Sequence, residues 1–379
     1  MADEQLRMAL IGTGHMGHNY IRMLQEHADG PICLSAAVAR HEPARNWLCE
    51  HYPDIIIYNS ADELYALGGS AFDATLVVTP QATHPAMVSQ AFDHGKHVLC
   101  DKPAGMSVGH AAPMLKAASA HPDLAFGMIF QQRFYARHQR IKQILDSGAL
   151  GTVKRVQLTD SQYFRTHFYH HTAPWRSSWH GEGGGVLIAQ GPHLLDLWQW
   201  LFGMPSTISA VIPFGKYNDF AVDDEATLVM TYPNGMTGTF IISTGEAVPE
   251  TRLDIRGSSG RLLMEGDLLR IWLFGQDTKI YHASAQCRDA GQLTMSYREE
   301  RIGNPHSMDH YWALFEDFAQ AALAPANTRH PLADGREGML SLELADAAYL
   351  SAWQNQHITL PLDAEYFEAA LRRHIDMER

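Results

Sequence analysis

The stretch MALIGTGHMGHNYIRML, residues 8–24, decides the fold, because its apolar run leads through glycines into an amphipathic helical pattern. Gly12, Gly14 and Gly17 stand in G-x-G-x-x-G spacing. The spacing alone is a weak signal, but a strand before it and a helix after it are the context that a dinucleotide-binding turn requires. We expect Gly12 to allow the tight turn, Gly14 to let the backbone approach a pyrophosphate, and Gly17 to let helix and strand pack closely.

Short apolar runs continue through the first third of the chain and alternate with amphipathic stretches such as THPAMVSQAFDHG, residues 83–95. Near-continuous apolar strands separated by helices predict βαβ units around a buried parallel sheet. The runs are ICLSAAVA (32–39), DIIIYN (54–59), DATLVVT (73–79), KHVLCD (96–101) and LAFGMIF (124–130).

The pattern changes after about residue 150, where several stretches alternate apolar and polar residues with the period of a strand. YPNGMT, residues 232–237, is a strong signal for a hairpin turn between two such strands. We expect one long helix near 185–201 and two more near 308–324 and 336–354. The second part of the chain is therefore predicted to be a meander of mostly antiparallel strands with a few helices.

With 379 residues the chain is too long for a single hydrophobic core, so two domains are expected. We predict an α/β protein with an N-terminal Rossmann dinucleotide-binding domain over residues 1–128. Residues 129–379 are predicted to form a C-terminal α+β domain with a large, open, mostly antiparallel sheet.

Charge and hydropathy argue against several classes of partner. The formal net charge of -13 disfavours nucleic acid as the main partner, and no apolar run approaches the ~20 residues that cross a bilayer. The first residues, MADEQLRMAL, lack the build of a signal peptide, so we expect a cytoplasmic protein. The cysteines lie far apart, and the histidines between 167 and 180 lack metal-ligand spacing, so no metal site is expected.

The end of the second predicted strand indicates the cofactor. The stretch AAVARHEPAR, residues 36–45, places Arg40 at the strand end and Arg45 shortly after it. An Asp or Glu at this point would accept the ribose 2′-hydroxyl of NAD, whereas a cation suits the 2′-phosphate of NADP. We therefore favour NADP, with NAD as the alternative in which Glu42 takes the ribose.

Four motifs occur in order along the chain: GTGHMG (12–17), VVTPQATH (77–84), GKHVLCDKP (95–103) and GEGGGVLIAQGPHLLDLWQWLFG (181–203). Together they resemble the glucose–fructose oxidoreductase / inositol dehydrogenase (Gfo/Idh/MocA) family over essentially the whole chain. The resemblance implies a Rossmann domain followed by an open-sheet domain. It also implies NAD(P)-dependent oxidation or reduction of a secondary hydroxyl on a sugar, glycoside or cyclitol, and a homodimer or homotetramer through the open sheet face.

The resemblance also implies site residues. The EKP-type motif of the family supplies an active-site lysine, and DKP, residues 101–103, matches it with Asp for Glu. Residues of VVTPQATH are implied to lie near the nicotinamide ribose. With the glycine turn and the arginines above, the candidate cofactor-binding residues are Gly12, Thr13, Gly14, His15, Met16, Gly17, Arg40, Arg45, Thr79, Pro80, Gln81, His84, Asp101 and Lys102.

The G-x-H motif of the family supplies a histidine, and GPH, residues 191–193, matches it. Many members carry an acid or amide four residues before that histidine. This chain has Ala189 there, with Gln190 next to it, a departure that bears on any relay in which a carboxylate orients His193.

The chemistry of an alcohol dehydrogenation explains why a lysine and a histidine would be needed. Removing hydride from a carbinol carbon leaves an oxygen that must lose its proton, so the site needs a base and a donor for developing negative charge. His193 suits the proton because imidazole titrates near neutral pH, and Lys102 suits the charge. The reverse assignment, with Lys102 as the base and His193 as the donor, stays open.

Candidate substrate contacts surround these groups. A mixture of amides, cations and aromatic rings suits a neutral polyol, whose hydroxyls need polar partners. The candidates are Gln132, Arg133, Tyr163, Arg165, Trp175, Arg176, Gln190 and His193.

We therefore predict an NAD(P)-dependent oxidoreductase that transfers hydride to or from a secondary hydroxyl or keto carbon of a sugar, glycoside or cyclitol. Two alternatives remain. The first is a non-catalytic dinucleotide-binding regulator of the same fold, which Ala189 alone favours. The second is an enzyme for a non-sugar ring such as a cyclohexadiene diol, and the polar, aromatic loop at 163–180 argues mildly against a large apolar substrate.

Overall fold

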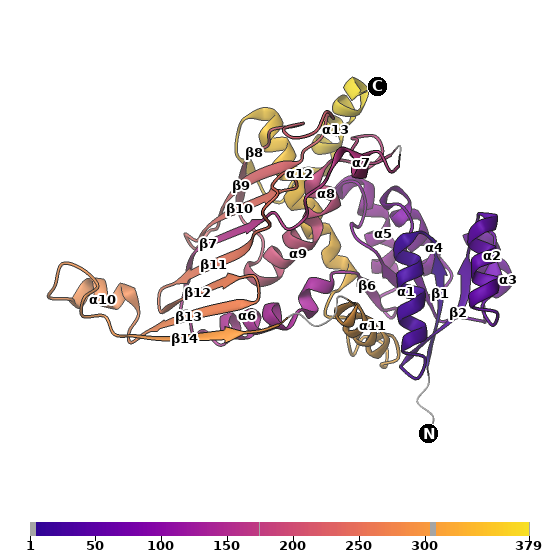
Figure 1. Ribbon diagram of the computed structural model, residues 1–379, viewed down its shortest axis with the longest axis horizontal. Helices are drawn as coiled ribbons and strands as arrows, with labels where there is room; N and C mark the ends of the chain where they lie inside the picture. Colours follow the sequence, from indigo (N-terminus) through magenta and orange to yellow (C-terminus); the bar gives the residue numbers. More distant parts are fainter. Residues whose placement is uncertain (1–4, 174, 304–307, 379) are drawn as a thin grey trace. The chain divides into compact units, whose positions relative to one another are not determined.

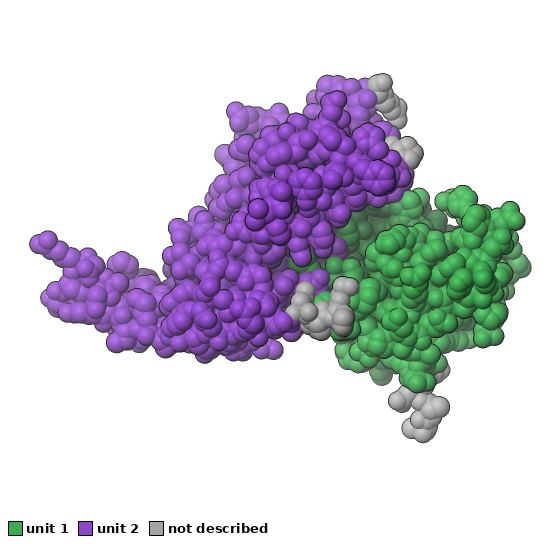
Figure 2. Space-filling model, in the orientation of Figure 1, with its two compact units in different colours: residues 1–134, 306–342 green, residues 135–305, 343–379 purple. Residues whose placement is uncertain are grey.

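The computed structural model describes residues 5–173, 175–303 and 308–378 (Figure 1). The chain divides into two compact units, residues 1–134 with 306–342 and residues 135–305 with 343–379 (Figure 2). The first unit thus takes a segment that the division predicted from sequence assigned to the second domain. The reason is aromatic packing, because Tyr311 and Phe315 of helix α11 (Asp309–Ala322) lie within 5.6 Å of the Tyr20 ring, centre to centre.

The sheet of the first unit is parallel throughout and has the strand order β3-β2-β1-β4-β5-β6. The strands β2 to β6 each lie within one of the apolar runs seen in the sequence, and β1 begins two residues before the stretch 8–24. The core strands β1, β4 and β5 are almost wholly buried, as expected for a sheet covered on both faces. The strands are β1 (Leu6–Ile11), β2 (Ile32–Val38), β3 (Ile56–Tyr58), β4 (Ala74–Val77), β5 (His97–Cys100) and β6 (Phe126–Met128).

The direction in which strands are added reverses between β1 and β4. Because parallel crossovers are right-handed, the helices before and after this point cover opposite faces of the sheet. The carboxyl ends of β1 and β4 therefore open a crevice, which is where such sheets bind ligands. The helices are α1 (His15–Glu26), α2 (Glu42–His51), α3 (Ala61–Gly68), α4 (His84–Asp93) and α5 (Val108–Ala120), with short 3₁₀ turns η1 (Gln81–Thr83), η2 (Gln131–Phe134) and η3 (Gly335–Glu337).

The second unit is built on a large, mostly antiparallel sheet with the order β14-β13-β12-β11-β7-β10-β9-β8-β15, as predicted (Figure 1). β7 and β10 run parallel. The predicted YPNGMT hairpin joins β9 to β10, with the Tyr232 amide donating to the Met236 carbonyl. The strands are β7 (Val153–Asp160), β8 (Thr207–Val211), β9 (Glu225–Thr231), β10 (Thr237–Ser243), β11 (Thr251–Gly257), β12 (Gly260–Glu265), β13 (Leu268–Phe274), β14 (Met295–Arg301) and β15 (Ile358–Thr359).

The long helix predicted near 185–201 is wrong, because the structure has two helices there, α8 (Val186–Ala189) and α9 (Gly191–Phe202), with Gln190 between them. Pro192 causes the break, since its ring would collide with a carbonyl of the preceding turn in one continuous helix. The buried Asp223 carboxylate then caps α8, accepting the Gly185 and Leu187 amides at 2.7 and 2.9 Å. His193 consequently lies in the first turn of its own helix.

The helices of the second unit pack against one face of its sheet. Trp198 of α9 packs directly over Gly238 of β10, where a β-carbon would lie 2.3 Å from the indole ring. The Trp198 indole also donates to the Tyr232 hydroxyl at 2.8 Å. The two later helices predicted from sequence are confirmed to within about two residues. Besides α8 and α9, the unit contains α6 (Ala136–Asp146), α7 (His167–His170), α10 (Thr278–Ser284), α13 (Ala364–Glu378) and most of α12 (Gly338–Gln354).

The search for membrane spans finds no helix among the described residues with the length and apolar character to cross a bilayer. Residues 1–4, on which the expectation about a leader partly rests, lie outside the described residues. Across residues 5–173, 175–303 and 308–378, no group of three or more His, Cys, Asp or Glu side chains is arranged to hold a metal ion.

Candidate functional site

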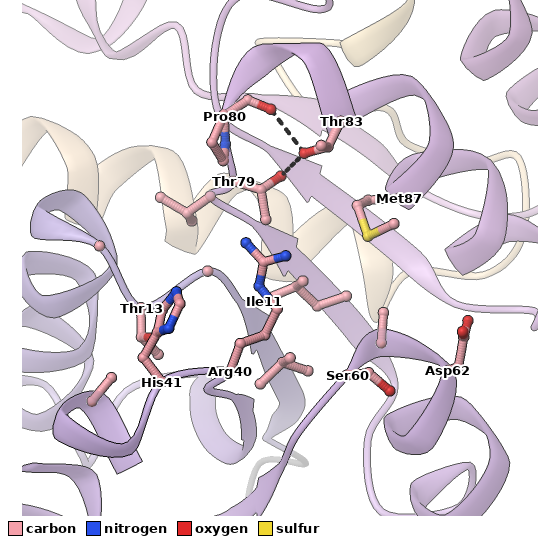
Figure 3. A pocket seen from close by; sticks show the side chains of 16 residues that line it. Ile11, Thr13, Arg40, His41, Ser60, Asp62, Thr79, Pro80, Thr83 and Met87 are labelled. Atoms are coloured by element: carbon pink, nitrogen blue, oxygen red, sulfur yellow. Dashed lines mark hydrogen bonds between the residues drawn. The ribbon is translucent and has the colours of Figure 1, made fainter. Parts of the chain in front are cut away.

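A cavity of about 480 Å³ opens at the carboxyl ends of β1, β2 and β4 (Figure 3). The turn after β1, residues 11–14, forms one wall, and the ends of β2 and β4 form others. This is the crevice that the strand order predicts for a dinucleotide. Its volume lies within the range of ordinary cofactor sites, about 300–1,000 Å³.

The three glycines of the turn meet different constraints. Gly12 has φ +115°, and a β-carbon there would lie 2.4 Å from the Val78 carbonyl oxygen. A β-carbon on Gly17 would lie 2.1 Å from the Gly12 carbonyl oxygen. A β-carbon on Gly14, by contrast, meets no described atom within 4 Å, and Gly14 lines the cavity. Gly12 and Gly17 therefore serve the fold, whereas Gly14 keeps the space before α1 open.

The start of α1 suits an anion. Gly14 is the N-cap residue and has no side chain with which to satisfy the first amide groups of the helix. Those amides and the positive end of the helix dipole favour negative charge in front of them. The local geometry thus fits the pyrophosphate expected from the glycine spacing.

The structure brings several of the predicted cofactor residues together. Arg40 is exposed and its guanidinium reaches into the cavity, between Thr13 and His41 on one side and Asp62 on the other (Figure 3). Within the part of the chain that the structure describes, the Arg40 side chain makes no hydrogen bond or ion pair. The predicted residues that line the cavity are Gly12, Thr13, Gly14, Arg40, Thr79 and Pro80.

The other predicted cofactor residues do not line the cavity, namely His15, Met16, Gly17, Arg45, Gln81, His84, Asp101 and Lys102. Arg45 has a structural contact instead. Its Nη1 donates to the carbonyls of Ala39 and Arg40 and to the Asn59 side chain, at 3.0–3.2 Å. It therefore fixes the loops after β2 and β3 around the cavity.

Sequence reasoning missed five polar or flexible residues of the wall, His41, Ser60, Asp62, Thr83 and Met87. Ser60 and Asp62 follow β3, whose carboxyl end lies at the same sheet edge as that of β2. The order of strands in a Rossmann sheet could have pointed to them. Asp62 accepts a hydrogen bond from the Gln90 side chain at 2.6 Å.

His84 lies in the interior of the first unit. Its Nδ1 is 2.7 Å from the Pro103 carbonyl oxygen and its Nε2 is 2.7 Å from the Thr79 carbonyl oxygen. The ring therefore links the segments that follow β4 and β5. Burial lowers the pKa of His84, and the two carbonyls and nearby Asp101 oppose that shift. Only the protonated ring could donate to both oxygens, so burial and hydrogen bonding pull its protonation in opposite directions.

Lys102 is the second residue after β5, at the carboxyl edge of the sheet, where the cavity also lies. Its amide donates to the Asp101 carboxylate at 2.8 Å, and its peptide bond to Pro103 is cis. Burial raises the pKa of Asp101, while the Lys102 and His84 charges oppose that shift. The lysine thus lies beside a half-buried acid.

His193 and the loop before it belong to the second unit. His193 is half-buried in the first turn of α9, and Gln190 is the N-cap residue of that helix. The Gln190 side chain donates to the Tyr169 hydroxyl at 3.2 Å, and Arg176 Nη1 donates to the same hydroxyl at 2.6 Å. Asp196 is buried and accepts a hydrogen bond from Gln199 at 3.0 Å.

The predicted substrate residues of the 163–180 loop gather around Tyr169. The Arg165 guanidinium lies 4.2 Å from the Tyr169 ring centre and 5.1 Å from that of Tyr163. The Arg176 guanidinium lies 4.4 Å from the Tyr169 ring centre and 4.9 Å from that of Trp175. We call Tyr163, Arg165, Tyr169, Trp175 and Arg176 the arginine–tyrosine cluster.

Gln132 and Arg133 belong to the first unit. The Arg133 side chain is only 1% exposed, pairs with the Glu337 carboxylate at 2.6 Å and donates to the Leu332 carbonyl at 2.8 Å. Through these contacts the Arg133 guanidinium links η2 to the segment around η3 and is neutralised by Glu337. A role in contacting substrate, which the sequence suggested for Arg133, therefore finds no support in its surroundings.

Comparison with known proteins gives two family matches. Residues 6–127 match the oxidoreductase family with an NAD-binding Rossmann fold, and residues 138–263 match the GFO/IDH/MocA C-terminal domain. The chain belongs to the Gfo/Idh/MocA family. It is therefore a nicotinamide-dependent oxidoreductase, as predicted from the sequence, and its first unit carries the NAD-binding domain of that family.

Members of the family and solved structures resemble the chain over most of its length. Trans-1,2-dihydrobenzene-1,2-diol dehydrogenase of Bos taurus is 26% identical over 257 residues, 67% of this chain and 72% of that protein. The WlbA dehydrogenase from Bordetella pertussis, in complex with NADH and UDP-GlcNAcA, has a TM-score of 0.75 at 22% identity and covers 96% of this chain and 100% of its own. Levoglucosan dehydrogenase, in complex with NADH and levoglucosan, has a TM-score of 0.78 at 17% identity, covering 95% of this chain and 100% of its own. At these identities the two structures show a shared fold.

Proposed function

We propose that the protein transfers hydride between NADP and a secondary hydroxyl or keto carbon of a sugar, glycoside or cyclitol. The observation that carries the proposal is the cavity at the carboxyl ends of β1 and β4, with Gly14 open toward it and α1 beginning behind it. The relatives named for dehydrogenation of a diol and of levoglucosan support a carbon that bears a hydroxyl as the reacting centre.

The choice of NADP rests on Arg40. Its guanidinium reaches into the cavity from the end of β2, where the 2′-position of the ribose lies in Rossmann domains, and it has no partner among the described residues (Figure 3). The Asp62 carboxylate lines the same cavity but is engaged by Gln90. A 2′-phosphate would give Arg40 an anionic partner, which the 2′-hydroxyl of NAD does not.

Comparing the two cofactors tests this choice. We expect wild-type kcat/KM to be higher with NADP than with NAD. Arg40→Ala should lower kcat/KM for NADP at least about tenfold and leave that for NAD within about threefold, as expected for loss of one charge-assisted contact. Arg22→Ala, an exposed arginine on α1 outside the cavity, is the matched control. A wild-type preference for NAD would overturn the choice.

The proposed proton chemistry rests on Lys102 and His193. A bound nicotinamide accepts or supplies the hydride. A ring nitrogen of His193 would take the hydroxyl proton, and Lys102 Nζ would donate a hydrogen bond to the oxygen as negative charge develops on it. The reverse assignment predicts the same dependence on both residues.

Substitution of each residue by methionine tests the assignment. Lys102→Met and His193→Met should each lower kcat by at least about 10²-fold, the usual size of an acid–base contribution. Cofactor affinity, measured by titration calorimetry, should stay within about threefold of wild type, because neither residue lines the cavity. Near-normal turnover in both variants would refute the roles proposed here.

A cyclic diol other than a sugar is the second candidate substrate, because the Bos taurus relative is named for one. A panel of sugars, glycosides, inositols and cyclic diols, assayed with both cofactors by nicotinamide absorbance, separates the two. Turnover confined to the cyclic diols would replace the first proposal by the second. Tight cofactor binding without turnover of any compound in the panel would instead favour a non-catalytic, dinucleotide-binding regulator.

We also propose that the open face of the second sheet forms a homodimer or homotetramer. Val229 of β9 and Val211 of β8 are 47% and 72% exposed, and their register places them on the same face. Tyr297 lies opposite Trp272 on the neighbouring strands β13 and β14. Light scattering at micromolar concentration should report an assembly, and a monomer would contradict the proposal.

A further inference from the structure

The arginine–tyrosine cluster holds more positive charge than its surroundings neutralise. The Arg165 and Arg176 guanidiniums lie within 4.4 Å of one ring centre, that of Tyr169, so less than about 9 Å separates them. The protein as a whole carries a net charge of -13, which makes a close pair of cations in a loop notable. Two like charges at such a separation repel, and an anion that contacts both guanidiniums would offset that repulsion.

The carboxylates near the two arginines already accept hydrogen bonds from backbone amides. Among the residues that the structure describes, Arg165 has no side-chain hydrogen bond and no ion pair. The carboxylate nearest Arg176 is that of Glu182, at 3.9 Å, and its other oxygen accepts the Ser177 amide at 2.6 Å. The Asp224 carboxylate accepts the amides of three successive residues, 216–218, at 2.8–3.2 Å. The cluster therefore lacks a dedicated carboxylate for Arg165.

His170, next to Tyr169, adds no positive charge to the cluster near pH 7. Its pKa is lowered to about 4, mainly by burial; the Asp224 charge opposes that shift, and the Arg176 and Arg165 charges add to it. Its Nδ1 lies 2.5 Å from the Ser177 hydroxyl. The ring is consequently neutral near pH 7, so the positive charge of the cluster belongs to the two arginines.

The cluster is connected to the helix that carries His193. Tyr169 accepts hydrogen bonds from Arg176 and from Gln190, the N-cap residue of α9, and His193 follows three residues later. With both acceptor positions of its hydroxyl used, Tyr169 keeps one hydrogen to donate. Donors from two arginines and a tyrosine thus lie next to Gln190, at the start of the helix that carries the histidine proposed to act on the substrate.

We propose that the substrate carries an anionic oxygen group, a carboxylate or a phosphate, and that Arg165 and Arg176 bind it. The inference rests on the proposed function, since it names the substrate class of the same site. Planar guanidiniums match the paired oxygens of such groups and bind them with charge-assisted hydrogen bonds. A sugar acid or a sugar phosphate fits this requirement, whereas the neutral polyol expected from the sequence leaves Arg165 without a counter-charge and Arg176 with only the Glu182 carboxylate at 3.9 Å.

Matched pairs of ligands test the proposal on the full chain in the presence of NADP. D-glucuronate is compared with D-glucose and D-galacturonate with D-galactose, and glucose 6-phosphate tests the phosphate. Binding is measured by titration calorimetry, and kcat and KM by nicotinamide absorbance. We expect the acids or the phosphate to bind at least about tenfold more tightly than the neutral sugars, and this advantage to shrink at high salt.

Substitutions of the two arginines test whether they are the residues that bind the charged group. Arg165→Gln and Arg176→Gln should each raise KM for the charged ligand at least about tenfold, keep kcat within about threefold and leave NADP affinity unchanged. Arg165→Lys should retain part of the affinity, because it keeps the charge but loses the planar fork. Arg155→Gln, an exposed arginine near the start of β7, is the matched control.

The outcomes separate this inference from the proposed function. Equal or tighter binding of the neutral sugars, no binding of any charged ligand, or unchanged KM in both glutamine variants would overturn the inference. Turnover of neutral sugars alone would support the proposed function but refute the inference that the substrate is anionic. Arginine-dependent binding of the charged ligands with no hydride transfer under either cofactor would uphold the inference and refute the proposed function.

Discussion

Replacing Gly14 by alanine separates the demands of the fold from those of the cofactor. Gly14 has φ -79° and ψ -169°, extended backbone that any residue adopts, and its β-carbon would meet no described atom within 4 Å. Alanine is a poorer N-cap than glycine, by about 0.5–1 kcal/mol. The loss of unfolded-state freedom favours alanine by about 0.4–1 kcal/mol. The two effects nearly cancel, so the free energy of unfolding should change by less than about 1 kcal/mol.

Cofactor binding should respond differently to the same methyl group. It would occupy the space in front of α1 where a pyrophosphate must approach the amides. Losing one hydrogen bond to a charged group costs about 1.5–3 kcal/mol. At 1.4 kcal/mol for each factor of ten, the Kd for NADP or NAD should rise about tenfold to a hundredfold.

Gly17→Ala is the matched control with the opposite pattern. Its β-carbon would lie 2.1 Å from the Gly12 carbonyl oxygen, so the backbone must move. Overpacking of this kind costs about 1–3 kcal/mol or more, which exceeds the gain of about 1 kcal/mol in helix propensity. We expect Gly17→Ala to lower the free energy of unfolding.

Urea unfolding without cofactor and titration calorimetry with each cofactor measure the two quantities. Gly14→Ala should keep the wild-type unfolding midpoint and lose affinity. Wild-type affinity for both cofactors in Gly14→Ala would refute the placement of the pyrophosphate. A loss of several kcal/mol in stability would refute the claim that the space at Gly14 is open.

Three further predictions concern stability. His84→Phe keeps a buried ring but leaves the two carbonyl oxygens beside it without a donor, so urea unfolding should show a loss of about 1–3 kcal/mol; an unchanged midpoint would contradict this. Gly238→Ala should cost about 1–3 kcal/mol in the same assay, because the methyl would overlap the Trp198 ring, and a stabilised variant would contradict that packing. The hydrogen bonds from Arg7 lower the pKa of Asp73 in the folded protein below its ordinary value of 3.8. The stability that this pair contributes is therefore complete above about pH 4 and is lost as the pH falls through the folded-state pKa of Asp73. Asp73→Asn should therefore flatten the fall in thermal midpoint below about pH 4, and an unaltered pH profile would count against the pair.

Local chemistry made much of the fold predictable. The runs at the centre of the sheet became buried parallel strands, because an element covered on both faces must be apolar at nearly every position. Gly12 is required by its φ of +115° and Gly17 by its contact with the Gly12 carbonyl in the same turn, and residues 232–237 form a hairpin through their own amides. The order of motifs predicted the family, which the matches over residues 6–127 and 138–263 confirm. The roles of Lys102 and His193 remain predictions.

The tertiary structure decided which charged groups are available. Arg40 and Arg45 look alike in the sequence, yet Arg40 reaches into the cavity and Arg45 is held by loop carbonyls. Arg133 finds its partner in Glu337, far along the chain. The sequence by itself determined the strands, the turn and the family, because periodicity and backbone conformation depend on neighbouring residues. Only the folded chain decided which arginines keep an unmet charge, because an ion pair depends on residues that the fold brings together from distant positions.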